Sequence, residues 1–298
     1  MRALLIGATG YLGAHVRSAA AATGVEVITA GRQPAGGRHV VLDLARDPQA
    51  LVEAVLAELA PDVVVNCAGA TTGDAEALSA GNIEVPATLV AAMTAGGRDM
   101  RLVHLGSAAE YGRGTPLVPV AEDTPARPLG LYGATKLGGT RLVQLARTAG
   151  LPAVVLRVFN PVGPGAPAHS LPGRAAAEVA RAIAENDRVR LGGLDAVRDF
   201  VDAGDVARAV LAAAVGPVPR QGLLNVASGR AVSARELVHG LVDIAGVTVA
   251  IDEGEAGSAR SADVAWQQAD VSAALAALDW QPCTPLEVSL KELWRSTV

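Results

Sequence analysis

Residues 6–13 read IGATGYLG, and this stretch joins the apolar run RALLI to an alanine-rich segment. The run predicts a buried strand and the segment predicts a helix, so the stretch forms the turn between them. Gly7, Gly10 and Gly13 permit a tight turn and a close approach of the backbone to a ligand. The first N–H groups of the helix can bind a pyrophosphate. The stretch therefore indicates a dinucleotide-binding βαβ unit.

The same alternation of apolar runs and helical segments continues to about residue 160. Further strands are expected at VEVITA, DVVVNCAG, RLVHLGS and AVVLRVFN. Continuous apolar runs suit strands that are covered on both faces, so they predict a parallel sheet between helices. Among the helices, one is expected to open at the cap residue Asp47, with Pro48 in its first position, and another to run from Tyr132 to Thr148.

After Asn160 the pattern becomes less regular and indicates a second lobe. A loop, NPVGPGAPAHSLPG, precedes a helix to about Glu185, and a helix over about 203–215 is expected to return to the first lobe. We predict an α/β protein: a Rossmann-type doubly wound parallel sheet with a smaller, discontinuous C-terminal α/β substrate lobe. The predicted domains are 1–161 plus about 199–222 for nucleotide binding, and about 162–198 plus 223–298 for the substrate.

Composition argues against several classes of partner. The net charge of −5 and the pI near 5.6 disfavour nucleic acid or an anionic membrane as a partner. No apolar run approaches about 20 residues and no signal-peptide pattern opens the chain, so a cytoplasmic protein is expected. The two cysteines and five histidines show no ligand spacing, so no metal is expected. Asp199, Asp202 and Asp205 could mimic a metal cluster, but turn and N-cap roles are the plainer expectation, with Asp202 beginning a helix.

The end of the second strand distinguishes between cofactors. An acidic side chain at this point binds the ribose hydroxyls of NAD. Here the strand ends ITAGRQ, which puts Gly31 and Arg32 in that place. A guanidinium can bind a 2′-phosphate that a carboxylate would repel. We therefore expect NADP(H); the alternative is that Arg32 is a solvated loop residue.

A second chemical signal is LYGATK, residues 131–136. The chain has only two lysines against 23 arginines, yet Lys136 stands four residues after Tyr132. By itself this could be an ordinary solvated pair on a helix face. A compact ammonium near the phenol would instead favour phenolate and let Tyr132 pass a proton near neutral pH. Ser107 could face the same crevice and donate to a carbonyl oxygen, although a serine after a strand is more often a cap or turn residue.

Six motifs in order carry a resemblance to a known family: GATGYLG, NCAG, GSAAEYG, YGATK, RVFNPVGPG and RDFVDAGDVARAV. Together they resemble the extended short-chain dehydrogenases/reductases, the group of NAD(P)-dependent nucleotide-sugar epimerases, dehydratases and ketoreductases, along nearly the whole chain. The resemblance implies a catalytic set of Ser107, Tyr132 and Lys136, in which Lys136 also contacts the nicotinamide ribose. It further implies that the C-terminal lobe binds a nucleoside diphosphate sugar.

The resemblance also implies which residues bind the ligands. Those for the cofactor are Gly7, Gly10, Tyr11, Leu12, Gly13, Arg32, Asp43, Leu44, Ala68, Gly69, Asn82, Tyr132 and Lys136. Those for the substrate are Ser107, Ala108, Asn160, Arg198 and Arg260. Arg198 matches the family arginine that holds the diphosphate, and Arg260 resembles a second one, although Ser261 replaces the usual proline. Asn160 could simply close its strand before Pro161.

Residues beside Ser107 distinguish the branches of the family. Dehydratases carry an Asp-Glu pair there, because removing water needs an extra acid and base, but this chain has Ala108 and Ala109. Epimerases that deprotonate a carbon beside a ketone use a cysteine where Ala109 stands, so His169, which resembles their histidine, has little weight. The motifs are most similar to GDP-4-dehydro-6-deoxymannose reductases and TDP-4-keto-6-deoxyhexose 4-ketoreductases.

The expected reaction is NADPH-dependent reduction of the C4 ketone of a TDP- or GDP-linked 4-keto-6-deoxyhexose in deoxysugar biosynthesis. Tyr132 would protonate the alkoxide, Ser107 would hold its oxygen and Lys136 would tune Tyr132. Two alternatives stay open: an NAD-dependent nucleotide-sugar 4-epimerase, which keeps its NAD, and a non-catalytic NADP-binding regulator. The family also implies a homodimer through the helices at about 82–96 and 132–148.

Overall fold

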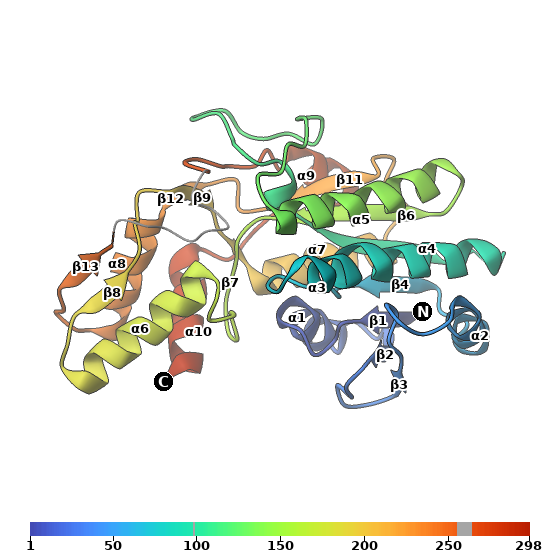
Figure 1. Cartoon of the computed structure of the whole chain (residues 1–298), viewed down its shortest axis with the longest axis horizontal. Helices are drawn as coiled ribbons and strands as arrows, with labels where there is room; N and C mark the ends of the chain where they lie inside the picture. The colour runs from blue at the N-terminus through green and yellow to red at the C-terminus, as the bar shows by residue number, and fades with distance from the viewer. Residues whose placement is uncertain (98, 255–263) are drawn as a thin grey trace.

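A seven-stranded sheet forms the centre of the computed structural model, which describes residues 1–97, 99–254 and 264–298. Its strands are β1 (Arg2–Ile6), β2 (Glu26–Gly31), β3 (His39–Val41), β4 (Val63–Asn66), β5 (Arg101–Ser107), β6 (Ala153–Val158) and β11 (Leu223–Val226). They lie in the order β11-β6-β5-β4-β1-β2-β3, and every neighbouring pair is parallel (Figure 1). The predicted doubly wound parallel sheet is confirmed.

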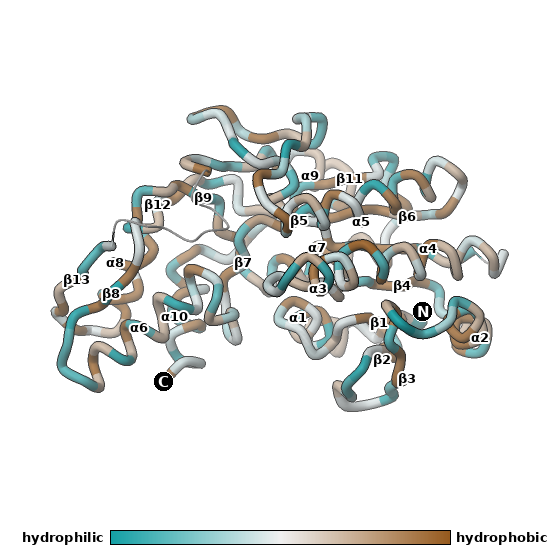
Figure 2. The backbone as a smooth tube through the Cα atoms, in the orientation of Figure 1, coloured by the Kyte–Doolittle hydropathy of each residue, from teal (hydrophilic) through white to brown (hydrophobic). Residues whose placement is uncertain are grey.

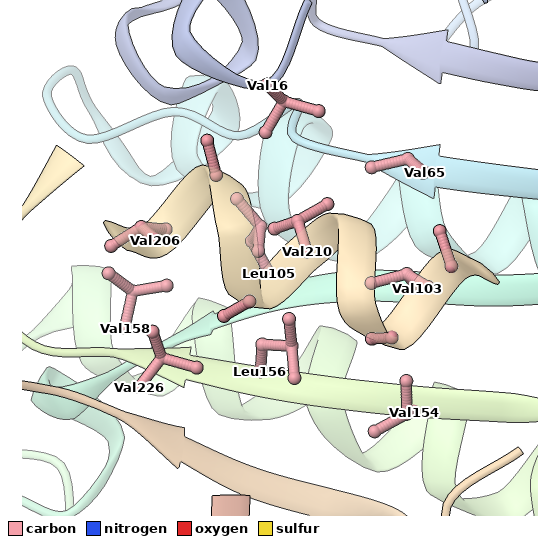
Figure 3. Close-up of a cluster of buried hydrophobic side chains, with 14 of the residues drawn as sticks. Val16, Val65, Val103, Leu105, Val154, Leu156, Val158, Val206, Val210 and Val226 are labelled. Atoms are coloured by element: carbon pink, nitrogen blue, oxygen red, sulfur yellow. The ribbon is translucent and has the colours of Figure 1, made fainter. Parts of the chain in front are cut away.

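Helices cover both faces of this sheet. One layer consists of α1 (Tyr11–Ala20), α7 (Ala203–Val215) and α9 (Ser272–Leu278), and the other of α2 (Gln49–Leu59), α4 (Val85–Ala95) and α5 (Leu131–Thr148). Between α3 (Ala75–Ser79) and α4 lies a π-helical turn, η1 (Ala80–Glu84). Successive strand residues point to opposite faces. Val103 and Leu105 therefore pack with α7 (Figure 3), while Leu102 belongs to the buried cluster on the α4 face.

A second group of short elements follows β6. It contains β7 (Pro161–Val162), α6 (Leu171–Glu185), β8 (Val189–Leu191), β9 (Val197–Asp199), β10 (Val201–Asp202), β12 (Ala231–Ser233), α8 (Ala234–Ala245), β13 (Ile251–Glu253) and α10 (Leu286–Thr297). Val179 of α6, Leu237 and Leu241 of α8 and Leu293 of α10 share one buried cluster. The loop from α6 to β8 is hydrophilic (Figure 2).

One predicted domain boundary does not follow the sheet. Residues 223–298 were expected in the second lobe, but β11 pairs with β6 at the edge of the main sheet, with Leu224 opposite Leu156. Ala274 and Trp280 also pack into the cluster that α7 forms with the sheet. These long-range contacts place β11, Ala274 and Trp280 with the first lobe. The rest of the predicted domain division stays a prediction.

Two predictions about helix starts had different outcomes. Asp202 does cap α7, because its Oδ1 accepts hydrogen bonds from the N–H groups of Gly204 and Asp205. The prediction for Asp47 is wrong: Pro48 is the N-cap of α2, and Asp47 Oδ2 accepts the Asp43 N–H at 2.7 Å instead.

Within the described ranges no helix combines the length and apolar character that crossing a membrane requires.

Candidate active site

A cavity of about 510 Å³ lies at the carboxyl ends of β1, β2 and β4. Parallel strands end at one edge of the sheet, so segments far apart in the sequence meet there. Predicted cofactor-binding residues in its lining are Gly7, Gly10, Arg32, Asp43, Leu44, Ala68 and Gly69. The other predicted cofactor residues, which are outside this lining, are Tyr11, Leu12, Gly13, Asn82, Tyr132 and Lys136.

The glycine turn after β1 leaves room for a ligand backbone. Gly7 has a φ of +77°, and a Cβ there would lie 2.6 Å from the Ala68 nitrogen. A Cβ on Gly13 would lie 2.1 Å from the Gly7 carbonyl oxygen, so this turn needs both glycines. Gly10 is the N-cap of α1 and has no side chain to accept the first N–H groups of the helix. The turn therefore fits a pyrophosphate, as a dinucleotide requires.

Two further cationic or ionisable side chains face the end of the cavity next to Arg32. Arg46 and His39 both line it, and the sequence analysis missed them. The His39 ring is fixed by Gly31, whose carbonyl lies 3.1 Å from Nε2, and by Thr29, whose hydroxyl lies 2.8 Å from Nδ1. No clear signal for them exists in the sequence, since Arg38 is nearer to Arg32 than Arg46 is and pairs with Glu26 instead. This corner offers charge-assisted hydrogen bonds to a phosphate.

Ser107 ends β5 and begins the short helix η2 (Ala108–Glu110). Its Oγ accepts the Ala109 N–H at 3.2 Å, while the Glu110 carboxylate accepts the Ser107 N–H at 2.8 Å. This reciprocal capping box fixes the conformation at the strand end. Because Oγ acts as an acceptor in the cap, its own O–H proton can still donate to a substrate oxygen.

Helix α5 lies directly against this strand end. A Cβ on Gly133 would lie 2.5 Å from the Ala109 carbonyl oxygen, so the residue after Tyr132 packs on η2. Further along α5, the buried Lys136 donates from Nζ to the Leu105 carbonyl at 2.5 Å. Ser107, Tyr132 and Lys136 therefore gather around the carboxyl end of β5.

Lys136 also borders the cofactor cavity. A Cβ on Gly69, which lines that cavity, would lie 3.7 Å from Nζ. Burial lowers the pKa of Lys136, and the nearby Glu110 and Cys67 act in the opposite direction. Burial also raises the pKa of Cys67 to about 12, which leaves a neutral thiol at neutral pH.

Asn82 connects the cavity wall to α5 from within the π-helical turn η1. Its Oδ1 accepts the Ala70 N–H at 3.0 Å, and its Nδ2 donates to the Ala70 carbonyl and to the Thr135 hydroxyl. π-Helical turns recur at functional sites. Asn82 thus holds the loop after β4 in place beside Lys136, whatever else it binds.

The predicted substrate residues lie at the junction with the second lobe. Asn160 donates from Nδ2 to the Asp199 carbonyl at 2.8 Å, and the buried Arg198 donates to the Val197 carbonyl. Burial lowers the pKa of Arg198 to about 10, so its guanidinium remains charged at neutral pH. Ala108 is buried and accepts from Gln267 Nε2. Arg260 lies outside the described residues.

Asp202 has the predicted N-cap role, whereas Asp199 and Asp205 do not act as turn or cap residues, because they accept hydrogen bonds from segments far away in the sequence. Asp199 accepts the N–H groups of Ser228, Gly229 and Ala269 together with the Ser228 hydroxyl, and Asp205 accepts from Cys283 and Thr284. Across the part of the chain that the structure describes, no group of three or more His, Cys, Asp and Glu is placed to hold a metal ion.

Comparison with known proteins places this site in a family. The chain is 38% identical to dTDP-6-deoxy-L-talose 4-dehydrogenase (NAD(P)(+)) of Kitasatospora kifunensis, over 98% of this chain and 94% of that protein. The solved structure of RMD from Pseudomonas aeruginosa complexed with NADPH is 26% identical with a TM-score of 0.83, covering 99% and 98% of the two chains. MoeE5 in complex with UDP-glucose and NAD is 27% identical with a TM-score of 0.86, covering 100% and 98%.

The model of the NAD dependent epimerase/dehydratase family matches residues 3–227, which include the cavity and all of β5 and α5. Both this match and the 38% identity over nearly the whole length agree with the site described above, which contains the glycine turn and Ser107, Tyr132 and Lys136. The chain belongs to the NAD dependent epimerase/dehydratase family, whose members are extended short-chain dehydrogenases/reductases that act on nucleotide sugars with a nicotinamide dinucleotide.

Proposed function

We propose that the protein is an NADPH-dependent 4-ketoreductase, which reduces the C4 ketone of a TDP- or GDP-linked 4-keto-6-deoxyhexose. The observation that carries this proposal is the 38% identity to a dTDP-6-deoxy-L-talose 4-dehydrogenase over 98% of the chain. Oxidation at C4 of a 6-deoxysugar nucleotide is the reverse of the proposed reduction. The alanines at positions 108 and 109 support a simple redox step, since dehydration needs a further acid and base beside Ser107.

In the proposed reaction, each residue around β5 has a separate role in reducing the ketone. When bound, NADPH supplies the hydride that C4 receives. The Ser107 hydroxyl donates a hydrogen bond to the ketone oxygen and stabilises the charge that develops there. Tyr132 transfers its phenolic proton to that oxygen, which completes the alcohol. Lys136 holds a positive charge one helical turn away and favours the phenolate that remains.

NADPH is proposed over NADH because of the corner formed by Arg32, Arg46 and His39. Arg32 occupies the place where an acidic residue would bind the ribose hydroxyls of NAD. Two guanidinium groups can bind the 2′-phosphate through charge-assisted hydrogen bonds. We expect NADH to be accepted with lower affinity, because the pyrophosphate turn at Gly7 and Gly10 serves both cofactors.

The second candidate is an NAD-dependent nucleotide-sugar 4-epimerase, which the family description and the NAD-bound MoeE5 favour. Such an enzyme oxidises and re-reduces C4 without net consumption of cofactor. A non-catalytic NADP-binding regulator is a third candidate, and the presence of Ser107, Tyr132 and Lys136 together speaks against it.

We also propose a homodimer through α4 and α5, which light scattering would test.

The deciding experiment measures NADPH oxidation with TDP- and GDP-linked 4-keto-6-deoxyhexoses offered separately, with NADH in parallel. Rapid oxidation of NADPH with one of them supports the ketoreductase and identifies the base. Tyr132→Phe should abolish turnover and keep NADPH binding. No oxidation with either sugar, together with NAD that stays bound through purification, would reject the proposal in favour of the epimerase.

A further inference from the structure

Glu110 is a fully buried carboxylate next to the reacting end of the site. Its side chain has 0% exposure, and its Oε2 accepts Arg157 Nε at 2.7 Å. Its Oε1 accepts two more hydrogen bonds, from the Ser107 N–H at 2.8 Å and from the Thr140 hydroxyl at 3.0 Å. One carboxylate therefore connects the end of β5, helix α5 and strand β6.

Strand β5 leaves space for the Glu110 side chain because residue 106 is a glycine. A Cβ on Gly106 would lie 2.8 Å from Glu110 Oε1 and 3.1 Å from Arg157 Cγ, so a side chain there would displace the ion pair. Arg157 is 2% exposed, and its guanidinium carbon lies 4.3 Å from the centroid of the Tyr111 ring. The Tyr111 hydroxyl in turn donates to Asn225 Oδ1 at 2.7 Å. The counter-ion of Glu110 is thus itself held on two sides.

Thr140 aligns the carboxylate with the catalytic helix. It is fully buried and follows Lys136 by four residues and Tyr132 by eight, so all three lie along one face of α5. A bond from Thr140 to Glu110 therefore fixes this face relative to Ser107, which Glu110 holds through its backbone. Ser107 must meet the same substrate oxygen as Tyr132, and small errors in such a geometry are costly.

We propose that Glu110 is a positioning residue: its buried carboxylate ties Ser107 to the Tyr132 and Lys136 face of α5 and presents a negative charge to Lys136, with Arg157 as its counter-ion. This inference rests on the catalytic roles of Ser107, Tyr132 and Lys136 in the proposed function. It goes beyond them because Glu110 touches neither substrate nor cofactor in this scheme.

The groups that face Lys136 determine what its charge depends on. Cys67 follows β4, His104 lies in the middle of β5, and Tyr132 lies one turn earlier on α5. Glu110 approaches from η2: its Oε1 lies against Gly106, the residue after the Leu105 whose carbonyl accepts the Lys136 hydrogen bond. Burial lowers the pKa of His104 well below its usual value and leaves it neutral, and the Cys67 thiol is neutral for the reason given above. Glu110, which is ion-paired with Arg157, is therefore the carboxylate that faces Lys136 in this set.

Two variants separate the tether from the charge. Thr140→Val removes one hydrogen bond and leaves the ion pair intact. Glu110→Gln combined with Arg157→Gln removes both charges in similar volumes, which avoids leaving an unpaired buried arginine. Thr284→Val is the matched control, because Thr284 donates at 2.7 Å to another buried carboxylate, Asp205, which is paired with Arg208.

The protein has only two lysines, so selective labelling of lysine side chains gives one NMR signal from Lys136 and one from the exposed Lys291. We expect the Lys136 titration midpoint to fall in the double variant, because the variant lacks the carboxylate that raises the pKa of Lys136. The Lys291 midpoint should stay unchanged and serve as the internal reference. Thr140→Val and Thr284→Val should leave both midpoints where they are.

Kinetics tests the tether. Thr140→Val should lower kcat about 10-fold and the double variant about 100-fold, each with an unchanged Kd for NADPH.

An unchanged Lys136 midpoint in a folded double variant overturns the charge role, and an unchanged kcat in Thr140→Val overturns the tether. If the wild type reduces no ketosugar, the proposed function fails, and the Lys136 midpoint decides the charge role of Glu110 without any substrate. Should the double variant not fold, Thr140→Val still decides the tether, since it keeps both charges.

Discussion

Helices α1 and α7 pack against each other on the same face of the sheet, yet they begin in opposite ways. At the start of α7, Asp202 accepts two backbone N–H groups and Asp205 adds a second carboxylate in the first turn. At the start of α1, the N-cap is Gly10 and the first turn holds no acidic residue. The chain's own carboxylate caps one helix start, and the other has no side-chain cap.

This difference teaches where to look for function in the fold. Backbone N–H groups at a helix start need an acceptor, and a carboxylate side chain supplies it at the lowest entropic cost. A glycine in that place gives up local stability in exchange for an anion site. The comparison shows the capping role of Asp202 and agrees with the binding role that we propose for the turn at Gly10.

The most direct test of this comparison gives α1 the same N-cap residue as α7 and measures NADPH binding. Gly10→Asp should weaken NADPH binding at least about 100-fold, because a carboxylate competes with the pyrophosphate for the same N–H groups. Fluorescence titration with NADPH measures the Kd. Gly10→Asn is the matched control, since it offers a neutral cap of the same size and should lose less affinity. Equal losses in the two variants would point to bulk rather than charge.

A second test asks whether the open start of α1 is sufficient for binding NADPH. Arg32→Ala should raise the KM for NADPH about 10- to 50-fold and leave the KM for NADH nearly unchanged, because only NADPH carries the 2′-phosphate. Arg38→Ala is the control, since Arg38 sits in the same loop but pairs with Glu26. A parallel rise for both cofactors would contradict the assignment of Arg32.

At α7 the expected effect is on stability. Asp202→Ala should lower the free energy of unfolding by about 2 kcal/mol, since it removes the cap and strands the Ser289 hydroxyl that donates to Oδ2. Denaturant unfolding measures this difference. Asp202→Asn retains a capping oxygen and should lose less. A stability equal to that of the wild type in Asp202→Ala would remove the contrast between the two helix starts.

The smallest expected effect concerns Asp205 and pH. Burial alone raises its pKa, but hydrogen bonds from Thr284 and Cys283 and the ion pair with Arg208 outweigh burial and hold the pKa below its usual value. A lowered folded-state pKa stabilises the fold above about pH 4, and this contribution is lost as the pH falls further. The stability difference between wild type and Asp205→Asn should therefore shrink by about 1 kcal/mol from pH 7 to about pH 3. A constant difference would exclude this role.

Much of the fold could be predicted because its signals are local. The strand at 101–107 and the helices ending at Thr148, Glu185 and Val215 follow apolar runs, glycines and caps that lie within a few residues. The errors involve distant partners. Strand β11 is defined by its pairing with β6, and Asp47 bonds the Asp43 N–H rather than capping a helix.

The same distinction holds for the site. The glycine turn and the Tyr132 and Lys136 spacing were readable, because each belongs to one short segment. Arg46, Glu110 and Arg157 were missed, because their roles depend on contacts between segments. A signal for the last two did exist: AAEYG and VLRVF each place a charge within an apolar, buried stretch, and such charges need a partner.

The strand order has a consequence for how such an enzyme can change. Arg32 follows β2 near one edge of the sheet, Ser107 ends β5 near the middle, and Asn160 follows β6 towards the other edge. In the proposed function, the choice of cofactor, the chemistry and the choice of sugar thus depend on three separate strand ends across the sheet. Descendants of one ancestral gene can exchange the outer loops independently while the central chemistry is inherited intact.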